Sequence, residues 1–409
     1  MYLFVFCYYI LVSLVHFCAL PILFLLSFKS KYEESLKRRF FIPEFLEEGA
    51  DIYWIHACSF GEIKALGPVL EALEKASKDN EKILLTTITQ TGFTLAQENY
   101  PKCIVCYLPF ESFIPFWIQN LSLKAFVLFE AELWLMPVFY AKKKGAKTFL
   151  INARISSFEK YQKGKFFYKR FFCYIDKIFC QKRGDKRNFE ALGAKDVEVY
   201  GNLKLCVNPQ VTQEYPIPNQ KIWVIASTHQ KDSTLEEVLI LKSLLKVLPK
   251  DLENCPRILF VPRHLERIGG IQQALDALLK SHNLPNLVVS SKVGIEKSLH
   301  FPFVLIDKMG VLNNLYALAE LVILGGSFLK GIGGHNPIEP AFFGVKLISG
   351  PYIFHQRALF DGIQNYVLCD ISQLENVLLY VDCLYPSCII KKIKISRIIQ
   401  ALRGVSEKA

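Results

Sequence analysis

The stretch IYWIHACSFGE, residues 52–62, sets the pattern that decides the fold. It opens with an apolar run typical of a buried strand and ends in polar residues around Ser59, a residue type that often caps a helix. From about residue 50 the chain repeats this alternation of apolar strands and amphipathic helices, which predicts a parallel α/β sheet. The first set of strands is expected at residues 52–57, 83–87, 104–108, 125–129, 148–151, 177–180 and 197–200.

A polar interruption divides this α/β pattern into two halves. Residues 207–220, VNPQVTQEYPIPNQ, contain three Pro and no apolar period, so we interpret them as a linker. A second set of strands is expected at residues 222–226, 258–261, 287–289, 304–306, 321–324 and 346–348. The sequence therefore predicts two Rossmann-like domains, residues 29–206 and 221–409, that face each other across a cleft. The last helix, at about residues 393–405, could pack on either domain.

Composition and charge narrow the class of protein and its partners. Of the 409 residues 51% are hydrophobic and 21% are charged, so the chain can bury a large core and does not have the composition of a disordered protein. A formal net charge of +11 indicates an anionic partner, such as nucleic acid, anionic lipid or a phosphorylated substrate. The 12 Cys are scattered along the chain, which favours reduced thiols in the cytoplasm over a disulfide-stapled secreted module.

The N-terminal segment has the composition of a membrane anchor. Residues 1–28 contain no Asp, Glu, Lys or Arg and are long enough to cross a bilayer, which takes about 20 apolar residues. The segment lacks the basic start and the cleavage site of a secretory signal, so we expect it to be retained. Lys29 and the basic residues after it predict that the rest of the chain stays on the cytoplasmic side. Pro21 could kink the helix or let it lie partly in the interface, and a buried core helix is the alternative.

Residues 142–187 form a basic stretch. They hold 15 Lys and Arg, three acidic residues and several interleaved Phe and Tyr. Next to a membrane anchor, this pattern favours anionic lipid headgroups over nucleic acid as the partner. A solvated helical face is the plainer interpretation.

Polar residues gather directly after the expected strands, where open parallel sheets bind their ligands. Glu62, three residues after Ser59, is either the partner of a helix capping box or a general base that takes a proton from an attacking hydroxyl. Glu130 and Glu132 follow another strand and are flanked by large apolar residues. They are either charges at the start of a helix or carboxylates that take part in acid–base catalysis or stabilise a developing charge.

The stretch GGSFLKGIGGHNPIE, residues 325–339, is the strongest local signal. We expect a helix with Asn336 as its cap, Pro337 in its first turn and Glu339 as the box partner, and phosphate binding at that helix start. An ordinary glycine-rich surface loop is the alternative. The spacing matches neither the Walker pattern nor GxGxxG, which disfavours an NTPase or an NAD enzyme.

Other candidate ligands are less specific. Arg263 and His264 could bind a phosphate or a base, or could be exposed strand-end charges. His229, His264 and His335 have no metal-ligand spacing among themselves, so the sequence predicts no metal site.

Together these segments resemble the bacterial transferases of 3-deoxy-D-manno-octulosonic acid (Kdo), which are specific for lipid A. The resemblance spans roughly residues 53–351 and is carried by IHACSFGE, TTITQTG, YLPF, FEAELW, INARIS, ALGAKDVEVYGNLK, ASTHQ, ILFVPRHLER, DKMGVLNNLYALAELVILGGSF and GGHNPIEPAFFGVKLISGP. It implies an inverting glycosyltransferase of the two-Rossmann GT-B architecture that uses CMP-Kdo and needs neither metal nor cofactor. It further implies a phosphorylated lipid A precursor as acceptor, a place at the inner membrane and no nucleic acid partner.

The resemblance also assigns site residues. The family's proton acceptor falls on Glu62, and its transition-state stabilisers fall on Glu130 and Lys204. Its CMP-binding positions fall on Pro262, Arg263, Met309, Gly310, Val311, Asn336, Pro337, Ile338 and Glu339. Val311 stands where the family usually has Glu, so a backbone contact would survive there and a carboxylate contact would not. Leu205 and Cys206 follow Lys204 where the family tends to have an aromatic residue and Asp.

Three other functions fit parts of this pattern. A different GT-B glycosyltransferase would prefer another nucleotide over CMP. A nucleotide-sugar epimerase shares the fold but has little need of a membrane anchor. A non-catalytic scaffold for anionic lipid would keep the basic stretch and release no CMP.

Overall fold

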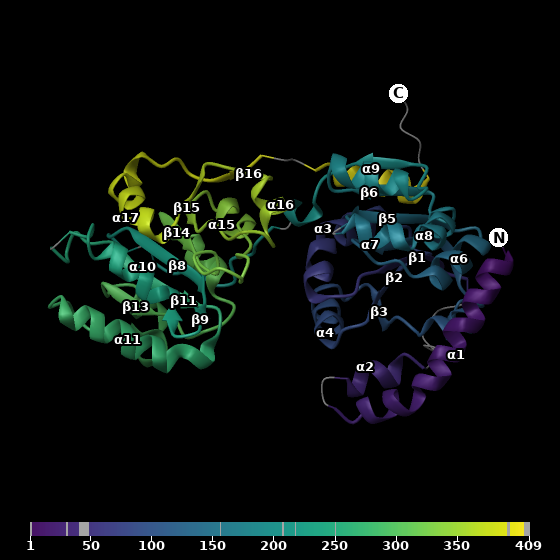
Figure 1. Cartoon of the computed structure of the whole chain (residues 1–409), viewed down its shortest axis with the longest axis horizontal. Coiled ribbons are helices and arrows are strands. Elements are labelled where there is room, and N and C mark those ends of the chain that lie inside the picture. Colours follow the sequence, from purple (N-terminus) through teal and green to yellow (C-terminus); the bar gives the residue numbers. More distant parts are fainter. Residues whose placement is uncertain are drawn as a thin grey trace. The chain divides into compact units, whose positions relative to one another are not determined.

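The computed structural model describes residues 2–29, 32–40, 49–155, 157–206, 208–216, 218–249, 251–390 and 393–404. Contacts between Cα atoms divide the chain into two compact units. The N-terminal unit comprises Met1–Val207 and Ile393–Ala409, and the C-terminal unit comprises Asn208–Lys392. Each unit is an α/β layer structure around a parallel sheet of seven strands (Figure 1).

The sheet of the N-terminal unit has the order β3-β2-β1-β4-β5-β6-β7, in which every neighbouring pair is parallel. Its strands are β1 (Asp51–His56), β2 (Glu81–Thr87), β3 (Ile104–Tyr107), β4 (Ser122–Phe129), β5 (Lys147–Ala153), β6 (Lys177–Cys180) and β7 (Val197–Val199). Its helices are α1 (Tyr2–Leu26), α2 (Glu33–Arg38), α3 (Phe60–Ala76), α4 (Gln90–Asn99), α5 (Ile114–Trp117), α6 (Leu135–Lys143), α7 (Phe158–Lys163), α8 (Lys165–Phe172), α9 (Arg183–Ala191) and α18 (Ile395–Arg403), with 3-10 turns η1 (Glu111–Phe113) and η2 (Leu203–Cys206).

Both faces of this sheet are covered by apolar side chains. On one face the buried Trp54 ring lies 5.0 Å from Trp117 and 4.3 Å from Phe126, centroid to centroid. On the other face Ile55 and Phe129 are completely buried. Each such side chain contributes about 1.5–3 kcal/mol by leaving water. Burial on both faces explains why these strands are continuous runs of apolar residues in the sequence.

The C-terminal unit repeats the architecture with the order β12-β13-β11-β8-β14-β15-β17. Its strands are β8 (Ile222–Thr228), β11 (Arg257–Pro262), β12 (Val288–Val289), β13 (Phe303–Leu305), β14 (Leu321–Leu324), β15 (Lys346–Ser349) and β17 (Tyr366–Leu368), with small antiparallel pairs β9 (Gln230–Lys231) with β10 (Thr234–Leu235) and β16 (Ile363–Gln364) with β18 (Cys388–Ile389). Its helices are α10 (Glu236–Leu244), α11 (Ile268–Ser281), α12 (Ser290–Val293), α13 (Ile295–Ser298), α14 (Leu312–Tyr316), α15 (Ile338–Phe342), α16 (Arg357–Phe360) and α17 (Ile371–Leu379), with 3-10 turns η3 (Leu265–Arg267) and η4 (Val381–Cys383).

The polar segment before β8 lies against the C-terminal unit. Asn314 in α14 accepts the backbone N–H of Thr212 at 2.9 Å, and the Asn313 side chain donates to the carbonyl of Gln210 at 3.2 Å. Residues 208–216 contain no helix or strand. Side-chain amides of α14 therefore satisfy backbone groups that an irregular segment leaves unpaired.

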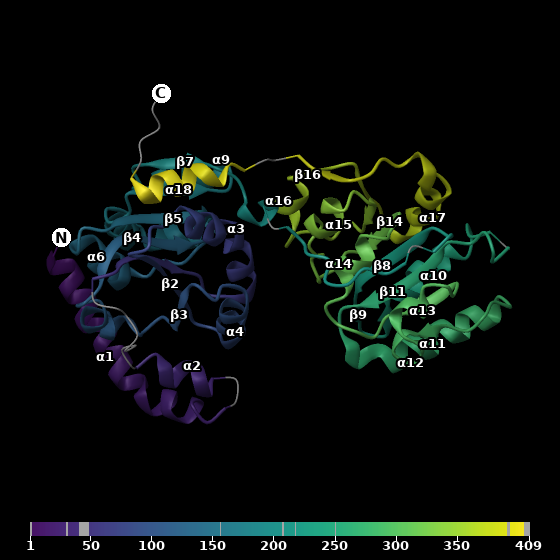
Figure 2. The ribbon, with the colours of Figure 1, turned by 180° about the vertical axis from the view of Figure 1, so that it is seen from behind.

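The last helix returns to the N-terminal unit, where α18 packs against α3 (Figure 2). Ile398 and Leu402 enter the same apolar cluster as Ile55. The Arg403 guanidinium lies 2.9 Å from the carboxylate of Glu81 at the start of β2. The N-terminal unit is thus built from both ends of the chain.

Helix α1 is long and apolar enough to cross a membrane. It has 25 residues, with a mean hydropathy of 2.4 over its most apolar 18-residue window. Pro21 lies within the helix, which continues to Leu26.

Candidate active site

The predicted catalytic residues of the N-terminal unit surround the point where its strand order reverses. Strands β1 and β4 are neighbours, and the chain winds away from them in opposite directions. Glu62 lies in the first turn of α3, which follows β1, and Glu130 follows β4 directly. Ligands bind at this kind of switch point in open parallel sheets.

Glu62 takes part in capping and also has the properties of a base. Ser59 is the cap of α3 and accepts the Glu62 backbone N–H at 3.4 Å. The Glu62 carboxylate accepts the Ser59 hydroxyl at 3.1 Å and the Cys58 backbone N–H at 2.8 Å. In a capping box it would accept the backbone N–H of the cap residue, Ser59, so the bond here goes to the residue before the cap. Partial burial raises the pKa of Glu62, and the charges of Glu132 and Glu130 act in the same direction. A carboxylate with a raised pKa holds a proton more readily, as a general base must.

Glu130 and Lys204, which lie far apart in sequence, form an ion pair. The Lys204 Nζ is 2.7 Å from one oxygen of Glu130, and the Arg154 Nε is 3.0 Å from the other. Asn152 donates to the Glu130 carboxylate at 3.3 Å. The carboxylate is buried, with 4% of Glu130 exposed, and it depends on these partners for compensation of its charge.

The backbone around this ion pair is strained. Glu130 has φ +55° and Asn152 has φ +52°, backbone angles that residues other than glycine rarely adopt. Asn152 also accepts the backbone N–H of Leu203 at 2.9 Å and so fixes the turn that carries Lys204. Strain of this kind costs on the order of 1–3 kcal/mol per residue and is concentrated at functional sites.

Glu132 belongs to a second cluster beside Glu62. Its carboxylate accepts the indole N–H of Trp134 at 2.7 Å. Ligand atoms of His56, Cys58 and Glu132 all lie within 4.8 Å of one another, a spacing that could hold a metal ion. The His56 Nε2 is 3.5 Å from the Cys58 sulfur, and burial with a hydrogen bond to Glu132 raises the pKa of the Cys58 thiol. The three groups therefore satisfy one another as a hydrogen-bonded set.

His56 gives the N-terminal unit a defined pH dependence. Its side chain is fully buried beside Thr86, and burial lowers its pKa to about 3. Since the unfolded chain binds a proton near pH 6.5 and the folded chain does not, the free energy of unfolding should fall as the pH drops below about 6.5, by up to about 1.4 kcal/mol per pH unit. Denaturant unfolding at several pH values should show this slope reduced in His56→Gln and unchanged in the exposed His300→Gln. Equal slopes in wild type and His56→Gln would rule out this origin.

The predicted CMP-binding residues lie at the carboxyl ends of strands in the C-terminal unit. Pro262 ends β11, and the exposed Arg263 follows it. Met309 and Gly310 precede α14. Val311 is 5% exposed, so its side chain belongs to the apolar interior. A buried apolar side chain leaves its backbone as the only polar contact at this position.

The expected helix after the glycine-rich stretch begins one residue later than predicted. Its N-cap is Pro337, and α15 begins at Ile338, so the assignment of Asn336 as cap is wrong. Asn336 still accepts the backbone N–H of Ile338 at 3.0 Å, because its short side chain can reach the amide two residues on. The helix has five residues.

A buried carboxylate that the sequence analysis did not single out shapes the glycine-rich stretch. Glu236 accepts the backbone N–H groups of Gly326 at 2.7 Å, Phe328 at 2.9 Å and His229 at 2.9 Å. A Cβ at Gly325 would lie 2.8 Å from the Thr228 Cα, so glycine is required for this close approach. The glycines thus serve to hold the stretch against the end of β8.

Two histidines 106 residues apart meet beside this stretch. The Nε2 atoms of His229 and His335 are 2.7 Å apart, so one ring donates and the other accepts. Burial lowers the pKa of both to about 4, and the nearby charges of His264 and Arg263 act in the same direction. Spacing along the chain gave no sign of this contact.

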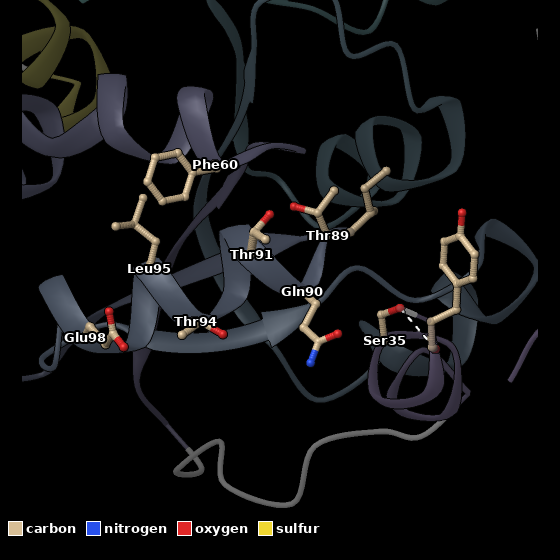
Figure 3. Close-up of a pocket in the computed structure, with 10 residues that line it drawn as sticks. Ser35, Phe60, Thr89, Gln90, Thr91, Thr94, Leu95 and Glu98 are labelled. Atoms are coloured by element: carbon tan, nitrogen blue, oxygen red, sulfur yellow. Dashed lines mark hydrogen bonds between the residues drawn. The ribbon is translucent and has the colours of Figure 1, made fainter. Parts of the chain in front are cut away.

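Each unit contains a cavity. One of about 560 Å³ in the N-terminal unit lies between α2 and the start of α4, with Ser35 on one side and Phe60 with Leu95 on the other (Figure 3). Phe60 lines this cavity and Glu62 does not, because side chains two positions apart on a helix point to different sides. One of about 530 Å³ in the C-terminal unit is bordered by Lys308, next to Met309.

Two units, each built on a parallel sheet of seven strands, give the chain the GT-B architecture. In fold, the chain is similar to a UDP-GlcNAc 2-epimerase from Neisseria meningitidis, with a TM-score of 0.54 and 13% identity over 87% of this chain and 94% of that one. A family model described as 3-deoxy-D-manno-octulosonic-acid transferase matches residues 34–207. The 3-deoxy-D-manno-octulosonic acid transferase of Chlamydia pneumoniae is 30% identical over 86% of this chain and 82% of its own length. That of Chlamydia muridarum is 29% identical over 87% and 83%. The chain belongs to this Kdo transferase family, as the resemblance predicted.

Proposed function

We propose that this enzyme transfers Kdo from CMP-Kdo to a lipid A precursor, with inversion, in lipopolysaccharide biosynthesis. The observation that supports this most strongly is the cluster at the β1–β4 switch point, where Glu62 has a raised pKa next to the Glu130–Lys204 ion pair. Membership of the Kdo transferase family supports the choice of sugar.

In the proposed reaction Glu62 takes the proton from the acceptor hydroxyl. The acceptor oxygen forms a bond to Kdo C2 while the bond from C2 to the phosphate oxygen breaks, and CMP leaves with the electron pair. Positive charge develops on the sugar ring, and carboxylates stabilise such states in glycoside chemistry. Glu130 would serve in this way, and Lys204 would share its charge between Glu130 and the departing phosphate.

The two units would hold the two substrates. The cavity beside Phe60, lined by hydroxyl, amide and aromatic side chains, suits a sugar of the acceptor. The basic stretch would attract the acceptor's phosphate groups and the anionic membrane surface. Arg263, Met309, Gly310 and the residues from Asn336 to Glu339 would bind CMP-Kdo in the C-terminal unit.

The proposed location is the cytoplasmic side of the inner membrane, with α1 as the only anchor among the described residues. An apolar helix without charges, followed by Lys29 and the basic stretch, suits the anionic surface of the cytoplasmic leaflet.

Nucleotide competition distinguishes this function from that of another GT-B glycosyltransferase or a lipid-binding scaffold. In calorimetric titrations of the full-length protein we expect CMP to bind at least about 10-fold more tightly than UDP, a difference of about 1.4 kcal/mol. Equal or tighter binding of UDP would contradict the donor, and no nucleotide binding would favour the scaffold.

A further inference from the structure

Helix α1 carries its polar side chains on one face. Tyr8, Tyr9, Ser13 and His16 are all half-buried, and their spacing places them along one side of the helix. Side chains on the opposite side, such as Leu3 at 73% and Leu14 at 58%, are exposed and apolar. The helix therefore has a side suited to protein and a side suited to lipid.

Hydrogen bonds tie the polar side to η1 of the N-terminal unit. The Tyr8 hydroxyl donates to the Glu111 carboxylate at 2.6 Å, and the Tyr9 hydroxyl donates to the carbonyl of Ser112 at 3.2 Å. About two turns further on, the His16 Nδ1 is 2.5 Å from the Ser112 hydroxyl. Glu111 is 8% exposed, and its other oxygen accepts the Met136 backbone N–H at 2.9 Å. Glu111 is thus a buried acceptor fixed by the Met136 amide, and Tyr8 supplies the donor for its second oxygen.

Aromatic contacts extend this docking to the first turn of α1. The ring of Tyr2 lies 6.0 Å from Phe139 in α6, and the ring of Phe4 lies 5.9 Å from Phe166 in α8. At the far end of the docked segment the His16 ring lies 4.4 Å from Phe110. The contacts cover residues 2–16, a length of about 21 Å at 1.5 Å per residue.

The chain after α1 also lies on the N-terminal unit. The Arg39 Nε donates to the carbonyl of Leu108 at 2.8 Å, and its guanidinium stacks 4.2 Å from the Phe110 ring. Both the start of α1 and the chain beyond its end therefore contact the same folded unit (Figure 1). A helix that crosses a hydrocarbon core of about 30 Å would place these two points on opposite sides of the membrane.

The exposed side of α1 continues onto a basic helix. Phe166 in α8 is 65% exposed, and the Arg170 guanidinium lies 3.3 Å from its ring and 5.2 Å from that of Phe4. Lys165 and Lys169 in the same helix are exposed. Apolar side chains flanked by cations are the signature of a helix that lies in the interface of an anionic membrane.

We propose that α1 does not cross the bilayer but lies in its plane, docked on the N-terminal unit through Tyr8, His16 and Glu111. The exposed side of α1, with Phe166 beside it, enters the headgroup and acyl boundary of an anionic phospholipid membrane, and Lys165 and Lys169 contact the phosphate groups. This arrangement holds the N-terminal unit against the membrane surface on which a lipid acceptor would lie. It does not depend on which sugar is transferred, and its tests need no activity.

Protease protection of the full-length protein tests this topology. One epitope tag precedes Met1 and a different tag follows Ala409, and the protein is expressed in a Gram-negative host. We expect protease to remove both tags in inverted inner-membrane vesicles and neither tag in intact spheroplasts. Permeabilised spheroplasts serve as the control that both tags can be cleaved. Removal of the N-terminal tag from the periplasmic side alone would overturn the proposal.

A double-mutant cycle tests the docking itself in membrane-reconstituted protein. Tyr8→Phe and Glu111→Leu should each lower the Tm, and the loss in the double variant should be smaller than the sum of the two single losses, because both remove the same hydrogen bond. Losses that add would show that Tyr8 and Glu111 do not meet in the membrane-bound enzyme, and the proposal would fail.

Discussion

Glu62→Gln should lower the rate of Kdo transfer by about 10²–10⁴-fold, the contribution typical of a general base. A Gln side chain can still accept a hydrogen bond from the Cys58 amide, but it cannot take the proton of the acceptor hydroxyl. The affinity for CMP should remain unchanged, because the proposed CMP-binding residues all lie in the C-terminal unit. Initial rates with CMP-Kdo and calorimetric titration with CMP measure the two effects separately.

Two control variants separate catalysis from helix capping. Ser59→Ala removes the cap of α3 and should cost about 0.5–2 kcal/mol of stability while transfer continues. Glu71→Gln changes an exposed carboxylate of the same helix and should have neither effect. If Glu62→Gln retained the wild-type rate, or if Ser59→Ala were as inactive as Glu62→Gln, Glu62 would not be the base.

Lys204→Met should lower the rate of transfer by about 10²–10³-fold, as the loss of one charge-stabilising group does. Stability should fall by only about 1–2 kcal/mol, because Lys204 is partly exposed and Arg154 still pairs with Glu130. Glu130→Gln should lower the rate to a similar extent. Because the two residues form one ion pair, the double variant should be less impaired than independent effects would predict.

The matched control for this ion pair is Lys177→Met. Lys177 starts β6 and pairs with Glu198 at 3.0 Å in the same sheet, at the opposite ends of the strands from Glu130. Its loss should leave the rate of transfer unchanged. Fully additive rate losses for Glu130→Gln and Lys204→Met would show that the pair does not act as a unit.

The strands could be predicted because a strand buried on both faces is a continuous run of apolar residues in the sequence. The expected strands at 177–180 and 321–324 match β6 and β14, and the others differ mainly at their ends. The edge strand β17 was missed, since Tyr366–Leu368 is short and half-exposed. The polar clusters at strand ends were predictable for the same reason, because parallel strands bring their carboxyl ends to one edge.

Pairing between distant side chains could not be predicted. Nothing in the sequence shows that Arg154 joins Lys204 on Glu130, or that His229 meets His335, because such contacts depend on strand order and loop course. The role of Glu236 could not be predicted for the same reason, because a carboxylate at the start of a helix is ordinarily a favourable surface charge. The return of α18 to α3 follows from packing of Ile398 and Leu402, whose amphipathic pattern does not specify a partner.

Mass spectrometry of a lipid A precursor incubated with CMP-Kdo and the full-length protein tests the central claim most directly. The account predicts that the acceptor gains the mass of one or more Kdo residues, that CMP appears in equal amount, and that both products are absent with Glu62→Gln. An acceptor whose mass stays unchanged while CMP-Kdo remains intact, or one that gains a sugar only from a UDP donor, would contradict it.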